Sequence, residues 1–132
     1  FKPLNKVASG GELSRISLAL SVSGTNTELI PCVVFDEVDV GISGSVAEIV
    51  GQMLKKLSIK YQIICVTHLA QVAAQGKDHI KVEKTQKDGL TYTSVTNLSK
   101  KERADEVARI LGGIEISHKT RIAAEEMIDS GS

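Results

Sequence analysis

The chain has 132 residues, of which 42% are apolar and 24% are charged. This composition is typical of a single globular domain with one modest core. Sixteen basic residues balance sixteen acidic ones, so the net charge does not indicate a surface for a polyanion. No apolar run approaches the roughly 20 residues that span a bilayer, and the N-terminus lacks the pattern of a secretory signal. We therefore expect a cytoplasmic protein with no membrane partner.

The first quarter of the chain predicts a helix followed by a strand. Ser9 and Glu12 have the spacing of a capping box, in which a hydroxyl and a carboxylate three residues apart cap a helix. We expect a helix from about Gly10 to about Val22, because apolar residues follow at helical intervals at Leu13, Ile16, Ala19 and Leu20. The run Cys32–Phe35 is short, apolar and β-branched, which indicates a buried strand.

A second helix and a second strand are predicted next. Ser45 and Glu48 repeat the capping-box spacing ahead of the apolar positions Ile49, Val50, Met53, Leu54 and Leu57. The apolar run Ile63–Val66 predicts another buried strand. A strand, a helix and a strand in this order predict parallel strands joined by a right-handed crossover. Cys32 and Cys65 lie within the two strand runs, which favours unpaired core thiols in a reducing compartment.

The pattern changes from residue 79 onward. Residues 80–83 and 90–95 alternate apolar and polar around a turn at 87–89, which predicts an antiparallel hairpin on the edge of a sheet. A capped helix is expected over residues 99–111, ended by a glycine pair, and a last helix over roughly residues 117–129. The expected fold class is α/β, with parallel strands, crossover helices and an antiparallel edge hairpin.

A glycine loop, Ser9-Gly10-Gly11-Glu12, opens the first predicted helix. Because glycines carry no Cβ atom, backbone N–H groups of such a loop can approach an anion closely. The positive end of the helix dipole favours a phosphate at the same place. An ordinary capped helix is the alternative, and the segment alone does not decide between the two.

Polar side chains follow both predicted strands. Asp36 and Glu37 come directly after the first strand, and His68 follows the second. The carboxyl ends of parallel strands meet at one edge of a sheet, where ligands gather. Asp36 there suits a hard cation such as Mg²⁺, Glu37 suits a general base acting on water, and His68 suits a contact with a phosphate oxygen. A solvated acidic loop and a structural histidine are the alternatives.

Three segments, taken in chain order, resemble the successive motifs of an ABC-type ATPase: Lys6–Arg15, Val34–Gly44 and Val66–Leu69. The Ser-Gly-Gly-Glu form of the first is similar to the SMC-like branch of that family. Two stretches resemble RecN-type DNA repair proteins in particular, Phe35–Gly44 and Leu69–Ala74. The resemblance covers essentially the whole chain and implies the C-terminal lobe of an ATPase head. Residues 1–132 would form a single domain, with the signature over 7–15, Walker B and the D-loop over 32–44 and the switch histidine within 63–68.

The resemblance implies roles for three residues that serve a nucleotide bound by their own head. Asp36 would be the Walker B carboxylate that holds Mg²⁺. Glu37 would be the catalytic base, and His68 would be the switch histidine.

The resemblance also implies residues that face a second head. Ser9, Gly10 and Gly11 would belong to the signature loop and cover the γ-phosphate held by the other head. Gly41 and Ser43 would lie in the D-loop at the interface between heads. This sequence has Ser43 where many ABC ATPases have an aspartate.

The phosphate-binding pattern Gly-x-x-x-x-Gly-Lys-[Ser/Thr] does not occur in the sequence. In RecN-like proteins the N-terminal half of the head supplies that loop, so this chain alone is expected to be inactive and to self-associate through uncovered apolar surface. The resemblance implies ATP and Mg²⁺ as cofactors, and as partners the N-terminal half of the same head, a second head in a homodimer, and DNA. The whole protein would be an ATPase of the nucleoid, active in recombinational repair of DNA double-strand breaks.

Two alternatives remain open at this point. The chain could be a head fragment of another ABC-type ATPase, or a non-catalytic interaction module that retains the fold. The endings Glu12–Arg15 and Asp39–Gly44 favour the RecN type. Glu37 and His68 are both present, which favours an ATPase.

Overall fold

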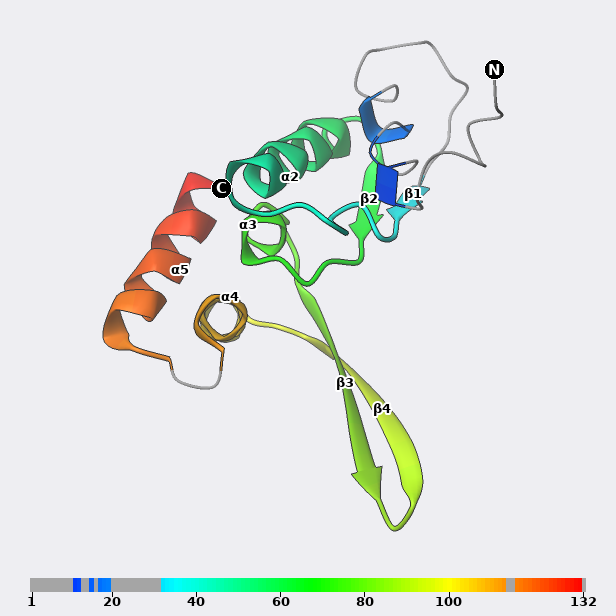
Figure 1. The fold of residues 1–132 in the computed structure, drawn as a ribbon, viewed down its shortest axis with the longest axis vertical. Helices are drawn as coiled ribbons and strands as arrows, with labels where there is room; N and C mark the ends of the chain where they lie inside the picture. The colour runs from blue at the N-terminus through cyan, green and yellow to red at the C-terminus, as the bar shows by residue number, and fades with distance from the viewer. Residues whose placement is uncertain (1–10, 13–14, 16, 20–31, 114–115, 132) are drawn as a thin grey trace.

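The computed structural model of the chain describes residues 11–12, 15, 17–19, 32–113 and 116–131. Gly11, Glu12, Arg15 and 17–19 are helical, and we call them the first helical segment; the rest of the helix expected over residues 10–22 lies outside the described residues. The other elements, in chain order (Figure 1), are β1 (Cys32–Phe35), α2 (Gly44–Ser58), β2 (Gln62–Cys65), α3 (Ala70–Ala73), β3 (Ile80–Lys87), β4 (Leu90–Asn97), α4 (Lys100–Gly112) and α5 (His118–Ser130). No helix within the described ranges is long and apolar enough to cross a membrane.

β1 and β2 form the parallel pair that the sequence predicts. The pairing runs from Cys32 opposite Gln62 to Phe35 opposite Cys65, and α2 makes the crossover between the strands. β1 has the predicted bounds, whereas β2 begins and ends one residue earlier than expected. The backbone N–H of Val66 still donates to the carbonyl of Phe35 at 2.9 Å, so the two backbone segments remain hydrogen-bonded just beyond the end of β2.

Among the described residues, elements cover only one face of this strand pair, which corrects the expectation of two buried strands. Phe35 is buried, and Val33 and Ile63 pack partly against the core. On the opposite face Val34 is 61% exposed and Ile64 is 47% exposed. Strands that are apolar on both faces belong to sheets with helices on both sides, and the described helices pack on one side only.

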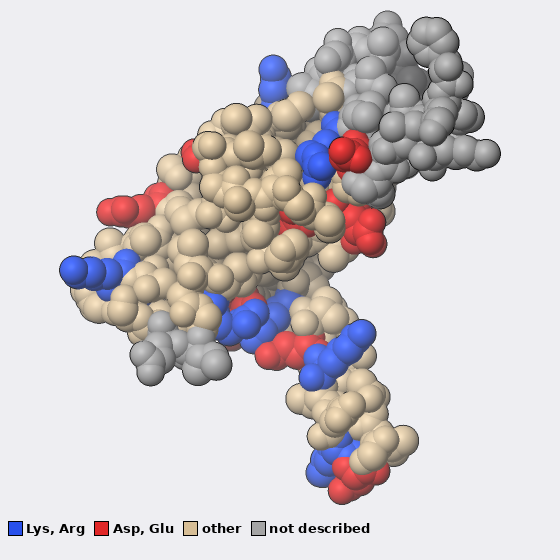
Figure 2. All heavy atoms as spheres, viewed as in Figure 1, with Lys and Arg blue, Asp and Glu red and all other residues tan. Residues whose placement is uncertain are grey.

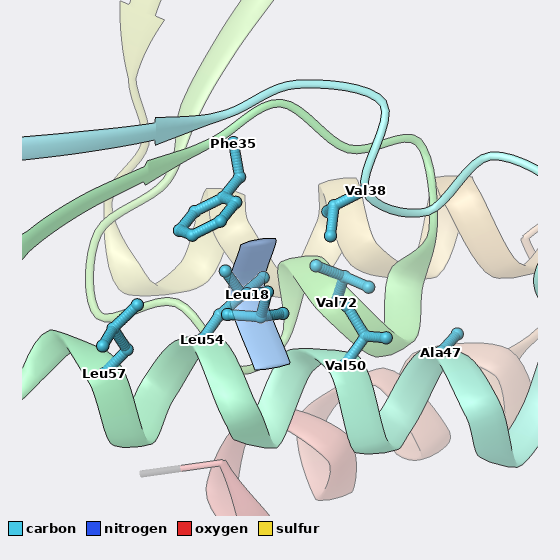
Figure 3. Close-up of a cluster of buried hydrophobic side chains, with 8 residues drawn as sticks. All are labelled: Leu18, Phe35, Val38, Ala47, Val50, Leu54, Leu57 and Val72. Atoms are coloured by element: carbon cyan, nitrogen blue, oxygen red, sulfur yellow. The ribbon is translucent and has the colours of Figure 1, made fainter. Parts of the chain in front are cut away.

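The first core cluster lies between the strand pair, α2 and the first helical segment (Figure 3). Its buried members are Leu18, Phe35, Val38, Ala47, Val50, Leu54, Leu57 and Val72. Leu18 supplies the contact from the first helical segment at 1% exposure, whereas Ala19 is exposed. The prediction for the first helix was therefore wrong at two positions: it put Ala19 on the buried face and did not include Leu18.

A second cluster of buried residues packs α3, α4 and α5 together, where the composition suggested a single core. Its members are Ala70, Ala74, Val107, Ala108, Ala124 and Ile128. The short helix α3, which the sequence reasoning missed, joins the clusters because Ala70 belongs to the second and Val72 to the first. Four of the six members are alanines, so the helices can approach one another closely.

β3 and β4 form the predicted antiparallel hairpin. Val82 lies opposite Val95, and Lys87 lies opposite Leu90 at the tip. Asp88 and Gly89 both have positive φ, 53° and 75°, which is the geometry of a type I′ hairpin turn. The hairpin does not sit on the edge of the parallel pair: in the described residues it is a separate two-stranded sheet that projects away from the helices (Figure 1). The expected edge position is therefore wrong for this chain.

Charged residues tie the base of the hairpin to α4. Lys81 of β3 lies 2.8 Å from Glu83 and 3.2 Å from Glu106 of α4, and Arg109 pairs with Glu106 at 2.6 Å. Burial opposes ionisation of Glu106, but its bonds with Arg109 and Lys81 outweigh burial and hold the pKa of its carboxyl below the usual value. Figure 2 shows basic and acidic side chains side by side where the hairpin meets the body.

Of the two predicted capping boxes that lie within the described residues, one is formed. Ser99 and Glu102 form a complete capping box at the start of α4, and the Ser117 hydroxyl accepts from Thr120 N at the start of α5. Gly113 ends α4 with a φ of 68°. The capping box predicted at Ser45 is not formed: α2 begins at Gly44 after Ser43, which makes no side-chain cap. Ser45 already lies within the helical turn, so it cannot occupy the N-cap position.

Candidate functional site

The predicted polar residues lie at the same end of the strand pair. Asp36 and Glu37 directly follow β1, and His68 lies three residues beyond β2. Phe35 pairs with Cys65, and Val66 N donates to Phe35 O. The two strand ends therefore deliver these residues to one edge, as the sequence reasoning expected.

The backbone at the two adjacent carboxylates is unusual. Both side chains are exposed, and the Asp36 carboxylate accepts a hydrogen bond from the backbone N–H of Glu37 at 2.9 Å. Glu37 has a φ of 58°, in the left-handed region that few residues other than glycine adopt. Such conformations persist where the surrounding structure enforces them and gather at functional sites. The turn thus aims two neighbouring carboxylates outward from the strand end.

The segment after Glu37 is a tight turn that leads into α2. Val40 N donates to Glu37 O at 3.2 Å, and Ile42 N donates to Asp39 O at 3.4 Å. Gly41 has a φ of 73°, which glycine adopts without strain. Gly41 and Ser43, the two D-loop positions singled out from the sequence, are both exposed on this turn.

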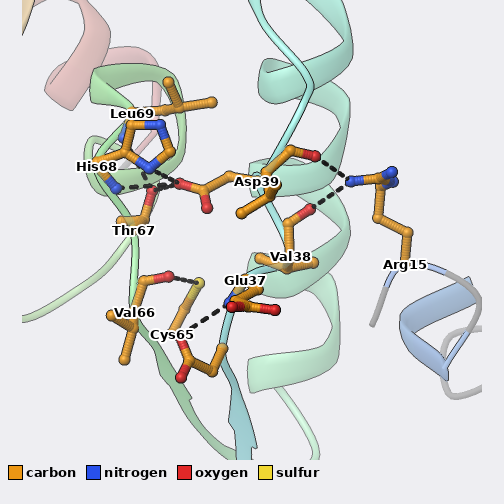
Figure 4. Close-up of polar contacts among 11 residues, drawn as sticks. Arg15, Glu37, Val38, Asp39, Cys65, Val66, Thr67, His68 and Leu69 are labelled. Carbon is orange, nitrogen blue, oxygen red and sulfur yellow. Dashed lines mark hydrogen bonds and ion pairs between the residues drawn. The ribbon is translucent and has the colours of Figure 1, made fainter. Parts of the chain in front are cut away.

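Asp39 holds the two strand ends together, and the sequence reasoning missed it. This residue is only 2% exposed. Its Oδ2 atom accepts from the Thr67 hydroxyl at 2.5 Å and from the His68 backbone N–H at 3.0 Å, and lies 3.4 Å from His68 Nδ1 (Figure 4). In the sequence Asp39 is simply a third acidic residue between two valines, and no local pattern marks it as buried.

The first helical segment packs directly on the same turn. Arg15 donates to the carbonyl oxygens of Val38 at 3.3 Å and Val40 at 2.8 Å (Figure 4). Gly11 is buried, and a Cβ atom placed there would lie 2.9 Å from the carbonyl oxygen of Glu37. Glycine at position 11 therefore has a packing reason, independent of any anion. Ser9 and Gly10 lie outside the described residues.

The carboxylates influence the thiol at the end of β2. Burial, with a further contribution from the negative charges of Asp39 and Asp36, raises the pKa of Cys65 to about 12. A thiol with such a pKa stays protonated at neutral pH and is a poor nucleophile. Cys32 and Cys65 are both free, which agrees with the expected unpaired thiols.

The exposed carboxylates at this edge are compatible with a Mg²⁺ ion that is also bound by waters and phosphate oxygens. In the described part of the chain no group of three or more histidine, cysteine, aspartate or glutamate side chains is arranged to hold a metal ion. Mg²⁺ in nucleotide sites usually takes one or two carboxylates and fills its other positions with waters and phosphate oxygens. A single exposed carboxylate at Asp36 fits that use.

The parallel crossover, with adjacent carboxylates after one strand and a histidine after the next, is an α/β arrangement whose strand ends suit a ligand site. The solved-structure comparison agrees on the fold: one match comes from work on ATP-driven dimerization and DNA-stimulated activation of SMC ATPases. It superposes with a TM-score of 0.57 at 24% identity, covering 83% of this chain and 65% of the other. The chain therefore has the fold of an SMC-type ATPase head.

The curated relatives that the chain matches include RecN-type DNA repair proteins. The chain is 52% identical over 128 residues to the DNA repair protein RecN of Haemophilus influenzae, 49% over 127 residues to that of Xylella fastidiosa (strain 9a5c) and 43% over 128 residues to that of Bacillus subtilis. These matches cover 96–97% of this chain and 22–23% of the relatives, so the chain spans about a quarter of their length. No family model matches. The chain is similar over nearly its whole length to a segment of RecN-type DNA repair proteins.

Proposed function

We propose that this chain supplies one wall of an ATP-hydrolysing site in the head of a RecN-type DNA repair protein. The observation that carries the proposal is the edge where β1 and β2 end, because it presents Asp36, Glu37 and His68 together. Asp39 joins the two strand ends at that edge through Thr67 and His68. An exposed pair of carboxylates beside a histidine suits a metal-bound triphosphate and an attacking water.

Each residue at the edge has one task in this proposal. Asp36 would hold Mg²⁺, which supplies charge neutralisation for the phosphates. Glu37 would take a proton from the attacking water as general base. His68 would hydrogen-bond a terminal phosphate oxygen and so place it relative to that water.

A neighbouring set of residues, on the same turn and the segment packed against it, would serve a second head. Ser9, Gly10 and Gly11 would cover the γ-phosphate bound by that head, and the exposed Gly41 and Ser43 would lie at the head–head interface. The contact of Gly11 and Arg15 with the turn after Glu37 supports this proposal, because residues of the two segments with these proposed roles touch each other.

The whole protein would contribute the remaining parts. The N-terminal half of the same head would provide the phosphate-binding loop, and residues 1–132 would form the C-terminal lobe as one domain. Two such heads would join on ATP and separate on hydrolysis while the protein acts on DNA at double-strand breaks in the nucleoid. This chain alone would not turn over ATP.

Glu37→Gln in the full-length protein tests the proposal. The amide keeps the shape of the side chain but cannot accept a proton, so ATP turnover should fall at least about 100-fold while ATP still binds. Steady-state phosphate release and nucleotide binding by fluorescence measure the two effects.

Glu126→Gln is the matched control. Glu126 is exposed on α5, away from the strand ends, and its variant should retain wild-type turnover. If Glu37→Gln hydrolysed ATP within about threefold of the wild type, Glu37 would not be the base.

A further inference from the structure

A buried carboxylate lies directly behind the predicted switch histidine. The side chain of Asp39 is 3% exposed, and that of His68 is 71% exposed. A buried charge is tolerated only where hydrogen-bond donors or opposite charges compensate it. Asp39 Oδ2 has three such neighbours, and all of them belong to Thr67 or His68.

The network fixes the chain around His68 from several directions. The Thr67 hydroxyl donates to Asp39 at 2.5 Å, and the same Oγ1 accepts from Leu69 N at 3.1 Å. The backbone N–H of His68 donates to Asp39 at 3.0 Å. Both the side chain of Thr67 and the peptide of His68 are therefore committed to this carboxylate, and the backbone that carries the imidazole is held in place.

We propose that Asp39 is a positioning residue for His68: its carboxylate keeps a proton on Nδ1 and leaves Nε2 to face the bound ligand. Nδ1 lies 3.4 Å from Asp39 Oδ2 and is the ring nitrogen that faces the carboxylate (Figure 4). A negative charge 3.4 Å from Nδ1 favours the tautomer with its hydrogen on that atom, because in the other tautomer a lone pair would face the charge.

The consequence for the site concerns Nε2. In the neutral ring Nε2 carries the lone pair and accepts a hydrogen bond. A ring that carries hydrogens on both nitrogens can instead donate from Nε2 to a phosphate oxygen, while Nδ1–H still faces Asp39. This catalytic consequence rests on the proposed function, whereas the tautomer itself does not.

The tautomer can be measured without ATP. The 132-residue chain with ¹⁵N-labelled histidine contains three such residues, His68, His79 and His118, and His68→Gln assigns the signal of interest. At a pH well above the ordinary histidine pKa of about 6.5, two-bond ¹⁵N–¹H spectra should show His68 with its proton on Nδ1. A wild-type His68 with the proton mainly on Nε2 would overturn the proposal.

Asp39→Asn should move the equilibrium toward the Nε2 proton. The amide oxygen can still accept from Thr67 and from the backbone of His68, so the variant removes chiefly the charge. Asp88→Asn is the matched control, because Asp88 lies exposed at the hairpin tip and its loss should leave all three histidines unchanged. Circular dichroism checks that each variant keeps its helix content. An unchanged tautomer in folded Asp39→Asn would overturn the proposal.

ATP turnover by the full-length protein is the second test of the proposal. Residues that orient a catalytic group typically cost about 10- to 100-fold when replaced, so Asp39→Asn should lower kcat by that factor and leave KM for ATP within about twofold. A merely structural loss would also weaken binding. If Asp39→Asn shifts the tautomer but keeps the wild-type kcat, Asp39 does not position His68 for catalysis. If the wild-type protein shows no ATP turnover, the proposed function is wrong, but the tautomer result still holds.

Discussion

Gly11 and the turn after Glu37 meet with no spare room. A Cβ atom at position 11 would lie 2.9 Å from the Glu37 carbonyl oxygen and 3.2 Å from Val40 Cβ. The nearest obstacle is backbone, which cannot rotate away as a flexible side chain can. One added methyl group at position 11 would therefore disturb the contact between the first helical segment and the turn that carries the carboxylates.

We expect Gly11→Ala to destabilise the fold by about 1–3 kcal/mol, the usual cost of overpacking. Urea denaturation followed by circular dichroism measures the change. Gly112→Ala is the matched control, because its Cβ would meet only the Thr120 side chain, at 3.0 Å. Within a helix alanine is favoured over glycine by up to about 1 kcal/mol, so this control should be neutral or stabilising. Equal effects of the two variants would contradict the tight contact at Gly11.

The helix α4 shows what an individual element contributes. Ser99 Oγ accepts from Glu102 N at 3.4 Å, and Glu102 Oε2 accepts from Ser99 N at 2.8 Å. The Ser99 hydroxyl, followed by the Ser99 backbone N–H, holds the pKa of Glu102 below its usual value. α4 also carries Glu106, which anchors the base of the hairpin, so the start of this helix supports the attachment of β3.

We expect Ser99→Ala to lower the free energy of unfolding by about 1 kcal/mol, the typical effect of losing an N-cap. Because the folded pKa of Glu102 is lowered, its contribution is present above the unfolded value of 4.5 and is lost as pH falls through the lowered value. The difference between wild type and variant should therefore shrink below about pH 4.5, which urea titrations at several pH values measure.

Ser58→Ala serves as the comparison for α4. The Ser58 hydroxyl donates to Lys55 O at the end of α2 and is exposed, so its removal should change stability by less than about 0.5 kcal/mol. A cap loss at Ser99 no larger than this change would mean that the capping box does not stabilise α4.

At the scale of the whole molecule, the uncovered face of β1 and β2 is the most consequential feature. Val34 and Ile64 lie opposite each other across the strand pair, and Val66 beyond them is also exposed. Apolar strand faces and unpaired edges of this kind recruit other chains. In the full-length protein the N-terminal half of the head would occupy this face.

We expect this chain to self-associate as its concentration rises, with no effect of Mg-ATP. Light scattering across a concentration series, with and without nucleotide, measures both. Val34→Thr combined with Ile64→Thr keeps β-branched side chains while reducing apolar surface, so it should weaken association. Val95→Thr on the exposed hairpin is the matched control and should leave association unchanged. A strictly monomeric chain, or association that requires ATP, would contradict this expectation.

The sequence by itself determined those features that depend on neighbouring residues. The apolar run of β1, the Asp88-Gly89 hairpin turn, the capping box at Ser99 and the placement of Asp36 after a strand all follow from local chemistry within a few positions. Even the shared edge of Asp36 and His68 followed from strand order, because a parallel crossover brings successive strand ends together.

Only the tertiary structure decided which groups are covered. Asp39 and Thr67 are 28 residues apart in the chain, and no local pattern distinguishes this buried aspartate from its exposed neighbour Asp36. In the same way, Leu18 rather than Ala19 is buried in the core. The hairpin forms a sheet of its own in the described residues instead of pairing with β1 or β2. Burial and charge compensation arise from contacts between distant segments, so they are fixed only when those segments pack.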